Sequence, residues 1–183
     1  MQKIMFNDRL GLTDAVLEGR KTMTRRIIGV NADNAFWHWN LVNRLWRVIF
    51  SIRGKQAELS RYARGEVVAI AQRYCDIVKG DGMPKGMESG WRNKMFVKAE
   101  EMQHHIKITD IKVERLQDIT EDECLREGVQ RLERGYVYKG MPESIDEYPT
   151  ARDAFAALID KVSGKGTWAS DPIVFAYSFE LVD

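Results

Sequence analysis

The sequence predicts a mixed α+β protein, a small and mostly antiparallel β-barrel with peripheral helices and inserted loops. Segments with strand character outnumber helical ones, and connections of uneven length join them, which disfavours a doubly wound parallel sheet. The chain has 183 residues, of which 44% are hydrophobic and 30% charged, as expected for one domain with a substantial core. We therefore expect a single domain over residues 1–183 with insertions near 31–60, 76–94 and 130–149.

The first half of the chain alternates between helical and strand patterns. Asn7 or Asp8 can cap a helix over residues 9–18, which Gly19 would end. Two strands are expected to follow, over the β-branched segment 22–28 and the apolar run 67–71.

Between these strands, the spacing of apolar residues in 36–61 predicts an amphipathic helix within an insertion. Its tryptophans and arginines allow three readings: a helix docked on the core, a surface that stacks bases and holds phosphates, or a surface for a protein partner.

The second half carries a shift of apolar parity between Ile108 and Ile111, which predicts a bulge or bend near Asp110. Thr120 and Glu123 form a capping-box pattern that opens a helix. The segments expected here are strands over 95–99 and 105–114, a helix ending at Gly128, a turn-rich stretch over 130–149, a helix over 151–162 and a closing strand over 173–182.

Composition excludes several classes of protein. The chain has no apolar run of about 18 residues and no apolar stretch near its start, so we expect neither membrane insertion nor export, and a cytoplasmic location. Cys75 and Cys124 lie far apart and are expected to be reduced, buried thiols.

Metal and cofactor chemistry find no support in the sequence. The histidines are His38, His104 and His105, and adjacent histidines on a strand point to opposite faces. Neither CxxC nor HExxH spacing is present, and no glycine-rich loop of the kinds that hold nucleotide phosphates occurs. We expect no metal and no cofactor.

The net charge of +1 conceals an asymmetry along the chain. From residue 1 to 60, ten lysines and arginines face five acidic residues, whereas residues 116–160 are richer in acids. This layout allows either a basic face that orients a phosphate-bearing ligand or an attraction between the two halves of the fold.

The densest chemical motif is the segment 19–26, GRKTMTRR. Its cations can hold phosphates or a developing oxyanion, and a threonine hydroxyl can bind a base or act as a nucleophile. The alternative is a solvated edge strand with paired charges. Because Lys21 and Thr24 have opposite parity on a strand, they can share a pocket only if Lys21 lies on the turn before it.

The chain resembles the ASCH domains of the PUA-like β-barrel superfamily. The motifs that carry the resemblance are GRKTMTRR at 19–26, RGEVV at 64–68, ITDIKVERL at 108–116, ITEDECLREG at 119–128 and the aromatic strand 174–181. The resemblance covers the chain apart from the three insertions.

This resemblance implies a barrel with a cleft for RNA, DNA or a single nucleoside. Some small members of the family deacylate N4-acetylcytidine, and their lysine, threonine and glutamate correspond to Lys21, Thr24 and Glu127. By the same chemistry, Thr24 would attack the amide carbonyl, Lys21 would help remove its proton, and Glu127 would protonate the leaving nitrogen. Without the resemblance, Glu127 could equally be a solvated residue at a helix end.

Three functions therefore remain open. The leading expectation is that the protein binds RNA or a modified nucleoside, with DNA as a further ligand. In that case the binding residues are expected to be Arg20, Thr22, Arg25 and Arg26. The alternatives are an amidohydrolase with Lys21, Thr24 and Glu127 as catalytic residues, and a regulatory module that binds a protein partner through residues 37–50.

Overall fold

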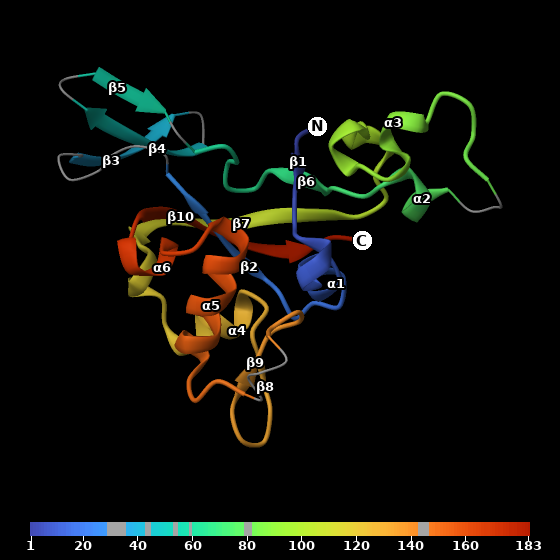
Figure 1. Cartoon of the computed structure of the whole chain (residues 1–183). Helices are drawn as coiled ribbons and strands as arrows, with labels where there is room; N and C mark the ends of the chain where they lie inside the picture. The colour runs from blue at the N-terminus through green and yellow to red at the C-terminus, as the bar shows by residue number, and fades with distance from the viewer. Residues whose placement is uncertain (29–35, 43–44, 53–54, 59, 79–81, 143–146) are drawn as a thin grey trace.

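The computed structural model describes residues 1–28, 36–42, 45–52, 55–58, 60–78, 82–142 and 147–183, and it gives no account of side chains between 36 and 58. Its helices and strands in chain order (Figure 1) are β1 (Lys3–Ile4), α1 (Leu12–Leu17), β2 (Met23–Ile27), β3 (Phe36–Val42), β4 (Leu45–Ile52), β5 (Lys55–Glu58), β6 (Val67–Ile70), α2 (Tyr74–Ile77), α3 (Glu88–Trp91), β7 (His105–Arg115), α4 (Glu121–Arg126), β8 (Gln130–Arg131), β9 (Tyr136–Val137), α5 (Ala151–Ser163), α6 (Thr167–Ser170) and β10 (Ile173–Leu181).

The centre of the molecule is a mixed five-stranded sheet with the order β1-β6-β7-β10-β2. β1 pairs with β6 in parallel, and the remaining neighbours are antiparallel. Strand β10 pairs with β7 on one side and β2 on the other, and its residues are buried from Ile173 to Phe179. Such burial on both faces explains why this strand is almost continuously apolar.

The sheet is curved, but its two edge strands are not paired. Aromatic contacts show the curvature: Phe6, just after β1, lies 5.8 Å from the ring of Phe179, and Tyr62 lies 5.3 Å from Tyr177. No backbone pairing joins β1 to β2 among the described strands, so the closed barrel expected from the sequence is not present there. A side chain crosses the opening instead, because the guanidinium of Arg26 donates to the carbonyl of Met5 at 2.5 Å.

We call this opening, between Met5 and β2, the open seam. Helices α4 and α5 lie beside the sheet, with α6 at one end (Figure 1). Helix α5 buries the apolar stripe that its sequence predicts, which consists of Ala151, Ala154, Phe155, Leu158 and Ile159.

Several elements are confirmed close to their expected bounds, namely β2, β6, β7, α4, α5 and β10. The expected bulge is also confirmed. Ser178 pairs with Asp110 and Phe179 with Ile108, so Thr109 is an extra residue in β7. The capping box of α4 forms as predicted, and Gly128 after the helix has a φ of 111°.

The helix predicted over 36–61 is wrong. Residues 36–42, 45–52 and 55–58 form the antiparallel sheet β3-β4-β5, which lies apart from the helices beside the main sheet (Figure 1). The alternation of Trp37, Trp39 and Leu41 with His38 and Asn40 fits a strand, and its β-branched neighbours favour one.

Two shorter predictions also need correction. Residues 95–99 are not a strand but two 3-10 turns, Lys94–Phe96 and Ala99–Glu101. The helix expected over 9–18 is divided, because Gly11 adopts a φ of 61° between a 3-10 turn and α1.

Both cysteines are free thiols, as expected. Cys124 is buried, whereas Cys75 is exposed, so the expectation of burial fails for Cys75. Among the described residues, no helix is long and apolar enough to cross a membrane.

The capping box makes a testable contribution to stability. The hydroxyl of Thr120 accepts from the backbone N–H of Glu123 at 3.2 Å, and Glu123 accepts in return from the N–H of Thr120 at 3.2 Å. We expect Thr120→Ala to lower the free energy of unfolding by about 1 kcal/mol in urea denaturation, because it leaves a helix N–H unpaired. Thr120→Ser is the matched control and should keep most of this stability. Equal losses in both variants would assign the effect to packing of the methyl group instead.

Candidate functional site

The GRKTMTRR segment runs from the end of α1 into β2. Gly19 adopts a φ of 72°, which turns the chain out of the helix. The N–H of Lys21 then donates to the carbonyl of Ala15 at 2.8 Å, and β2 begins two residues later at Met23. Lys21 thus lies on the turn rather than on the strand, which meets the geometric condition for sharing a pocket with Thr24.

Lys21 and Glu127 form a buried ion pair. The ammonium of Lys21 donates to the Glu127 carboxylate at 2.6 Å and to the Glu127 carbonyl at 2.7 Å. The two side chains are only 2% and 6% exposed. Burial lowers the pKa of Lys21 from its ordinary value of 10.5; Glu127 opposes this shift, and Arg26 and Arg25 add to it.

Arg25 holds Glu127 from the other side and joins it to two more carboxylates. Its guanidinium lies 2.5 Å from Glu114, 2.8 Å from Glu123 and 3.2 Å from Glu127. Burial opposes protonation, but Glu127, Glu114 and Glu123 together raise the pKa of Arg25 above its ordinary value. Arg25 is therefore a permanent cation that is fully engaged inside the protein.

Glu123 links this network to the surface. Its carboxylate also accepts from Lys112 at 2.7 Å. Burial alone would raise the pKa of Glu123, but the hydrogen bonds from Lys112 and the Thr120 backbone, together with the charges of Arg25 and Lys112, lower it to about 2. Of the two explanations for the charge asymmetry of the sequence, attraction between the two halves of the chain therefore applies to Lys21 and Arg25, because their partners are acidic residues of the second half.

A small cavity of about 40 Å³ brings Lys21, Thr24 and Glu127 together. The apolar face of α5 lines it through Phe155, Leu158, Ile159 and Val162. Thr24 is 5% exposed, and its hydroxyl makes no hydrogen bond to another described residue. A space of this size holds water or a small acyl group, but not a nucleoside.

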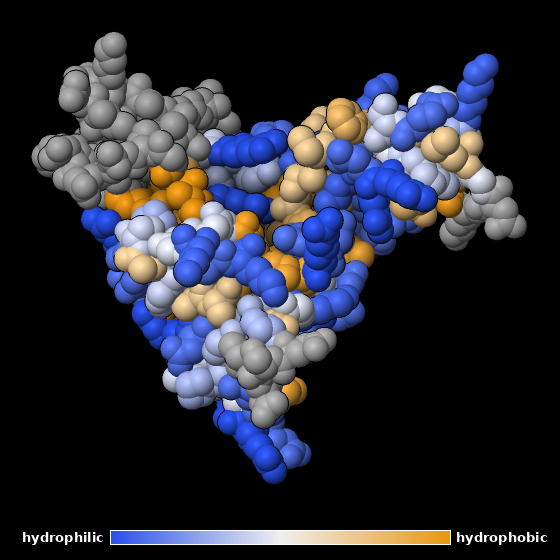
Figure 2. All heavy atoms as spheres, in the orientation of Figure 1, coloured by the Kyte–Doolittle hydropathy of each residue, from blue (hydrophilic) through white to orange (hydrophobic). Residues whose placement is uncertain are grey.

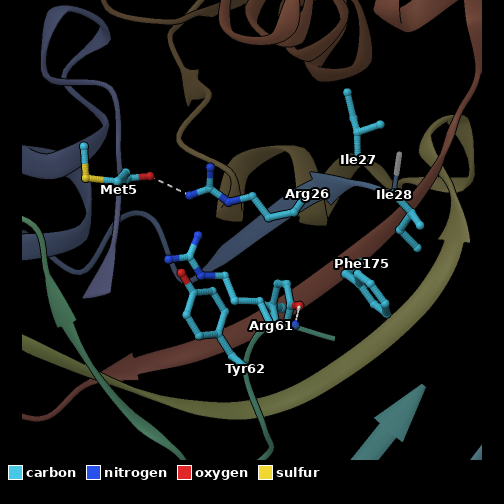
Figure 3. A pocket seen from close by; sticks show the side chains of 8 residues that line it. Met5, Arg26, Ile27, Ile28, Arg61, Tyr62 and Phe175 are labelled. Atoms are coloured by element: carbon cyan, nitrogen blue, oxygen red, sulfur yellow. Dashed lines mark hydrogen bonds between the residues drawn. The ribbon is translucent and has the colours of Figure 1, made fainter. Parts of the chain in front are cut away.

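A larger cavity of about 280 Å³ occupies the open seam. It shares Met5 and Arg26 with the small cavity, and the remaining residues that line it are Ile27, Ile28, Arg61, Tyr62, Phe175 and Tyr177. Figure 3 shows the guanidinium groups of Arg26, from β2, and Arg61, from the segment before β6, extending in the same direction above the aromatic rings. Two cations and aromatic walls in one cavity suit a planar, anionic or strongly polar ligand.

The two arginines of this cavity differ in their freedom. Arg26 donates to Met5 and lies 5.8 Å from the ring of Phe6, and burial lowers the pKa of Arg26, with Arg61 adding to the effect. Arg61 is exposed, and its guanidinium makes no hydrogen bond or salt bridge to another described residue, although it lies 5.6 Å from the centre of the Tyr62 ring. Among the described residues, the guanidinium of Arg61 is therefore less constrained than that of Arg26.

The remaining residues of GRKTMTRR lie outside both cavities. Arg20 is exposed and paired with Glu18 at 2.5 Å. Thr22 accepts from the guanidinium of Arg126 at 3.1 Å. Of the four residues expected to bind nucleic acid, only Arg26 lines the larger cavity, and Arg25 contributes a wall of the smaller one.

Sequence reasoning missed Arg61, Tyr62 and Met5. No local motif marks them, since they become neighbours of Arg26 only through the curvature of the sheet. Tyr177 lies in the aromatic strand already noted, and its hydroxyl accepts from the backbone N–H of Arg61 at 3.2 Å. In the part of the chain that the structure describes, no group of three or more His, Cys, Asp or Glu side chains could hold a metal ion.

A scan against protein-family models, a search of the curated proteins and a search of the solved structures each found no match. The residues and the geometry of the two cavities are therefore what indicates a function.

The buried pair can be tested by a double-mutant cycle. Glu127→Gln should lower the free energy of unfolding by about 3 kcal/mol or more, because it leaves the Lys21 ammonium buried without its carboxylate. Lys21→Met combined with Glu127→Gln should cost less than the sum of the two single changes, with a coupling of about 1–3 kcal/mol in urea denaturation. Additive losses would contradict a direct interaction between the two charges.

Proposed function

We propose that the protein binds a nucleobase-containing ligand, RNA or a modified nucleoside, in the cavity of the open seam. The observation that carries the proposal is that two cationic side chains, Arg26 and Arg61, line one cavity of about 280 Å³ together with the aromatic residues Tyr62 and Tyr177. This volume lies close to the lower end of small-molecule sites, about 300 Å³.

The chemistry of the cavity fits such a ligand. Bases stack on aromatic rings and on guanidinium planes, and an unpaired arginine forms charge-assisted hydrogen bonds with a phosphate or a base carbonyl. The ring of Tyr62 is held in place because its hydroxyl donates to the carbonyl of Lys3 at 3.0 Å. A rigid aromatic wall reduces the entropy lost on binding.

Membership of the ASCH domains within the PUA-like superfamily forms part of this proposal. Three features support it: the succession of α1, the GRKTMTRR turn and β2; the curved five-stranded sheet; and the meeting of Lys21, Thr24 and Glu127 on one cavity. In this reading the open seam corresponds to the cleft of a barrel that backbone pairing leaves open.

Binding is tested by calorimetric titration with cytidine 5′-monophosphate. We expect Arg61→Ala to weaken binding about tenfold, because one charge-assisted hydrogen bond contributes about 1.5–3 kcal/mol. Arg64→Ala is the matched control, since Arg64 is an exposed arginine outside the cavity, and it should leave the affinity unchanged. The absence of measurable binding to cytidine, its monophosphate and short RNA would refute the proposal.

A second function, hydrolysis of N4-acylated cytosine nucleosides, is favoured by the small cavity. Lys21, Thr24 and Glu127 line it together, and its volume of about 40 Å³ suits an acetyl group. Met5 and Arg26 line both this space and the larger cavity, which could hold the nucleoside. Two adjacent spaces of unequal size match the two parts of such a substrate.

The reaction has a consistent proton balance. Thr24 attacks the amide carbonyl as neutral Lys21 takes the hydroxyl proton. This proton passes from Lys21 to the Glu127 carboxylate, 2.6 Å away, and Glu127 gives it to the leaving nitrogen as the C–N bond breaks. Water then hydrolyses the acyl ester on Thr24, which releases the carboxylic acid and restores the threonine. The lowered pKa of Lys21 increases the fraction of the neutral amine at a given pH.

Hydrolysis is tested by incubating the protein with N4-acetylcytidine and measuring cytidine. Thr24→Val and Lys21→Ala should each lower the rate by about 100-fold or more, whereas Thr24→Ser keeps the hydroxyl and should keep activity. The rate should rise with pH as Lys21 loses its proton, with a midpoint below 10.5. Full activity in Lys21→Ala would exclude this mechanism.

The third function, a regulatory module that binds a protein partner through residues 37–50, stays an expectation, but the described residues of this segment form strands β3 and β4 rather than a helix. The side chains of this segment lie outside the described residues.

A further inference from the structure

We infer that the physiological ligand is a single-stranded polynucleotide, and that a groove around Phe96 and Lys98 binds a nucleotide next to the one held in the open seam. This inference rests on the proposed function and names the substrate class of the same site. It starts from an open groove of about 440 Å³ lined by Met1, Gln2, Lys3, Arg61, Met95, Phe96, Val97, Lys98, Ala99 and Glu100.

The groove continues the cavity of the open seam. Arg61 lines both, so a chain that leaves the cavity past its guanidinium enters the groove. The backbone of Arg61 is fixed on both sides: its N–H donates to Tyr177, and its carbonyl accepts from the side chain of Gln2 at 3.0 Å. The backbone of Arg61 is thereby held at the junction, and its guanidinium has no hydrogen-bond or salt-bridge partner among the described residues.

The groove presents an unusually exposed aromatic side chain. Phe96 is 63% exposed and its neighbour Met95 is 65% exposed. Water contact with adjacent large apolar side chains costs free energy, and such patches mark binding surfaces. Figure 2 shows apolar and hydrophilic residues side by side around a hollow on the face of the molecule that it draws.

The segment that carries Phe96 is rigidly attached, so its exposure belongs to the fold. The ammonium of Lys3 donates to the carbonyls of Lys94, Met95 and Val97 at 3.1, 2.7 and 2.7 Å. From the other end, the buried Lys94 ammonium donates to the carbonyl of Phe6 at 2.6 Å. These bonds fix the 3-10 turn Lys94–Phe96 with its two apolar side chains outward.

The charges around Phe96 favour a polyanion. Lys98 is exposed, and its ammonium, like the guanidinium of Arg61, makes no hydrogen bond or salt bridge within the described part of the chain. The groove has one acidic side chain, Glu100, and it already accepts from the N-terminal ammonium at 3.1 Å. An aromatic platform flanked by unpaired cations is the arrangement that stacks a base and holds its phosphate in single-stranded nucleic acids.

The test measures the affinity of a ladder of ribo- and deoxyribo-oligonucleotides, from one to about eight nucleotides, by fluorescence anisotropy and calorimetry. We expect affinity to rise at the second or third nucleotide. Phe96→Ala should weaken oligonucleotide binding at least about fivefold, the equivalent of about 1 kcal/mol per stacked base, and leave mononucleotide binding unchanged. Phe96→Trp should retain the affinity, and Lys98→Gln should reduce the salt dependence of binding.

Leu132→Ala is the control for loss of an exposed apolar side chain, since Leu132 is 46% exposed and lies outside the groove. Mononucleotide binding without a gain along the ladder, or an unchanged affinity in Phe96→Ala, would overturn the inference and leave the proposed function intact. If neither ligand binds, both fail. A change of sedimentation in Phe96→Ala without a change in oligonucleotide affinity would assign the groove to a protein contact and also overturn it.

Discussion

The interaction on which the candidate site depends is the buried charge network of Lys21, Arg25 and Glu127. It ties the turn after α1 to the end of α4, 106 residues further along the chain in the case of Lys21 and Glu127. Removing such charges from water costs several kcal/mol each, and apolar residues of similar volume are often no less stable in their place. The network is therefore better explained by what it positions than by the stability it provides.

Lys21 and Arg25 position Glu127 within this network. Arg25 and Lys21 hold the Glu127 carboxylate from two sides, and Lys21 also donates to the carbonyl of the same residue. The position of the Glu127 carboxylate is thus fixed before any ligand arrives, and Thr24 lines the same cavity with its hydroxyl uncommitted among the described residues. Preorganised charge of this kind is what general acid–base chemistry requires.

Local patterns predicted the parts of the fold that local interactions determine. Thr120 and Glu123 predict the start of α4 because the capping hydrogen bonds lie within one turn. The shift of apolar parity around Thr109 predicts the bulge in β7. Residues 36–52 were misjudged because their apolar residues satisfy both helical and strand spacing, and pairing between β3 and β4 decides the outcome. The resemblance to a family predicted Lys21, Thr24 and Glu127 as site residues. Arg61 and Tyr62 could not be predicted, because they come close to Arg26 only through the curvature of the sheet. The partners of Arg25 were equally inaccessible, since Glu114, Glu123 and Glu127 are separated from it by about a hundred residues.

The place of β10 in the sheet also governs the order of folding. It follows every other strand in the chain, yet it lies between β7 and β2 and is the only neighbour of β2 among the described strands. Strand β2, and with it the turn that carries Lys21, therefore cannot join the sheet during synthesis until residues 173–181 have left the ribosome. Pairing of such distant segments is slow, because the entropy of closing a long loop is lost before the contacts form. The candidate site is thus among the last regions to form, and until then its cations and threonines remain exposed to solvent.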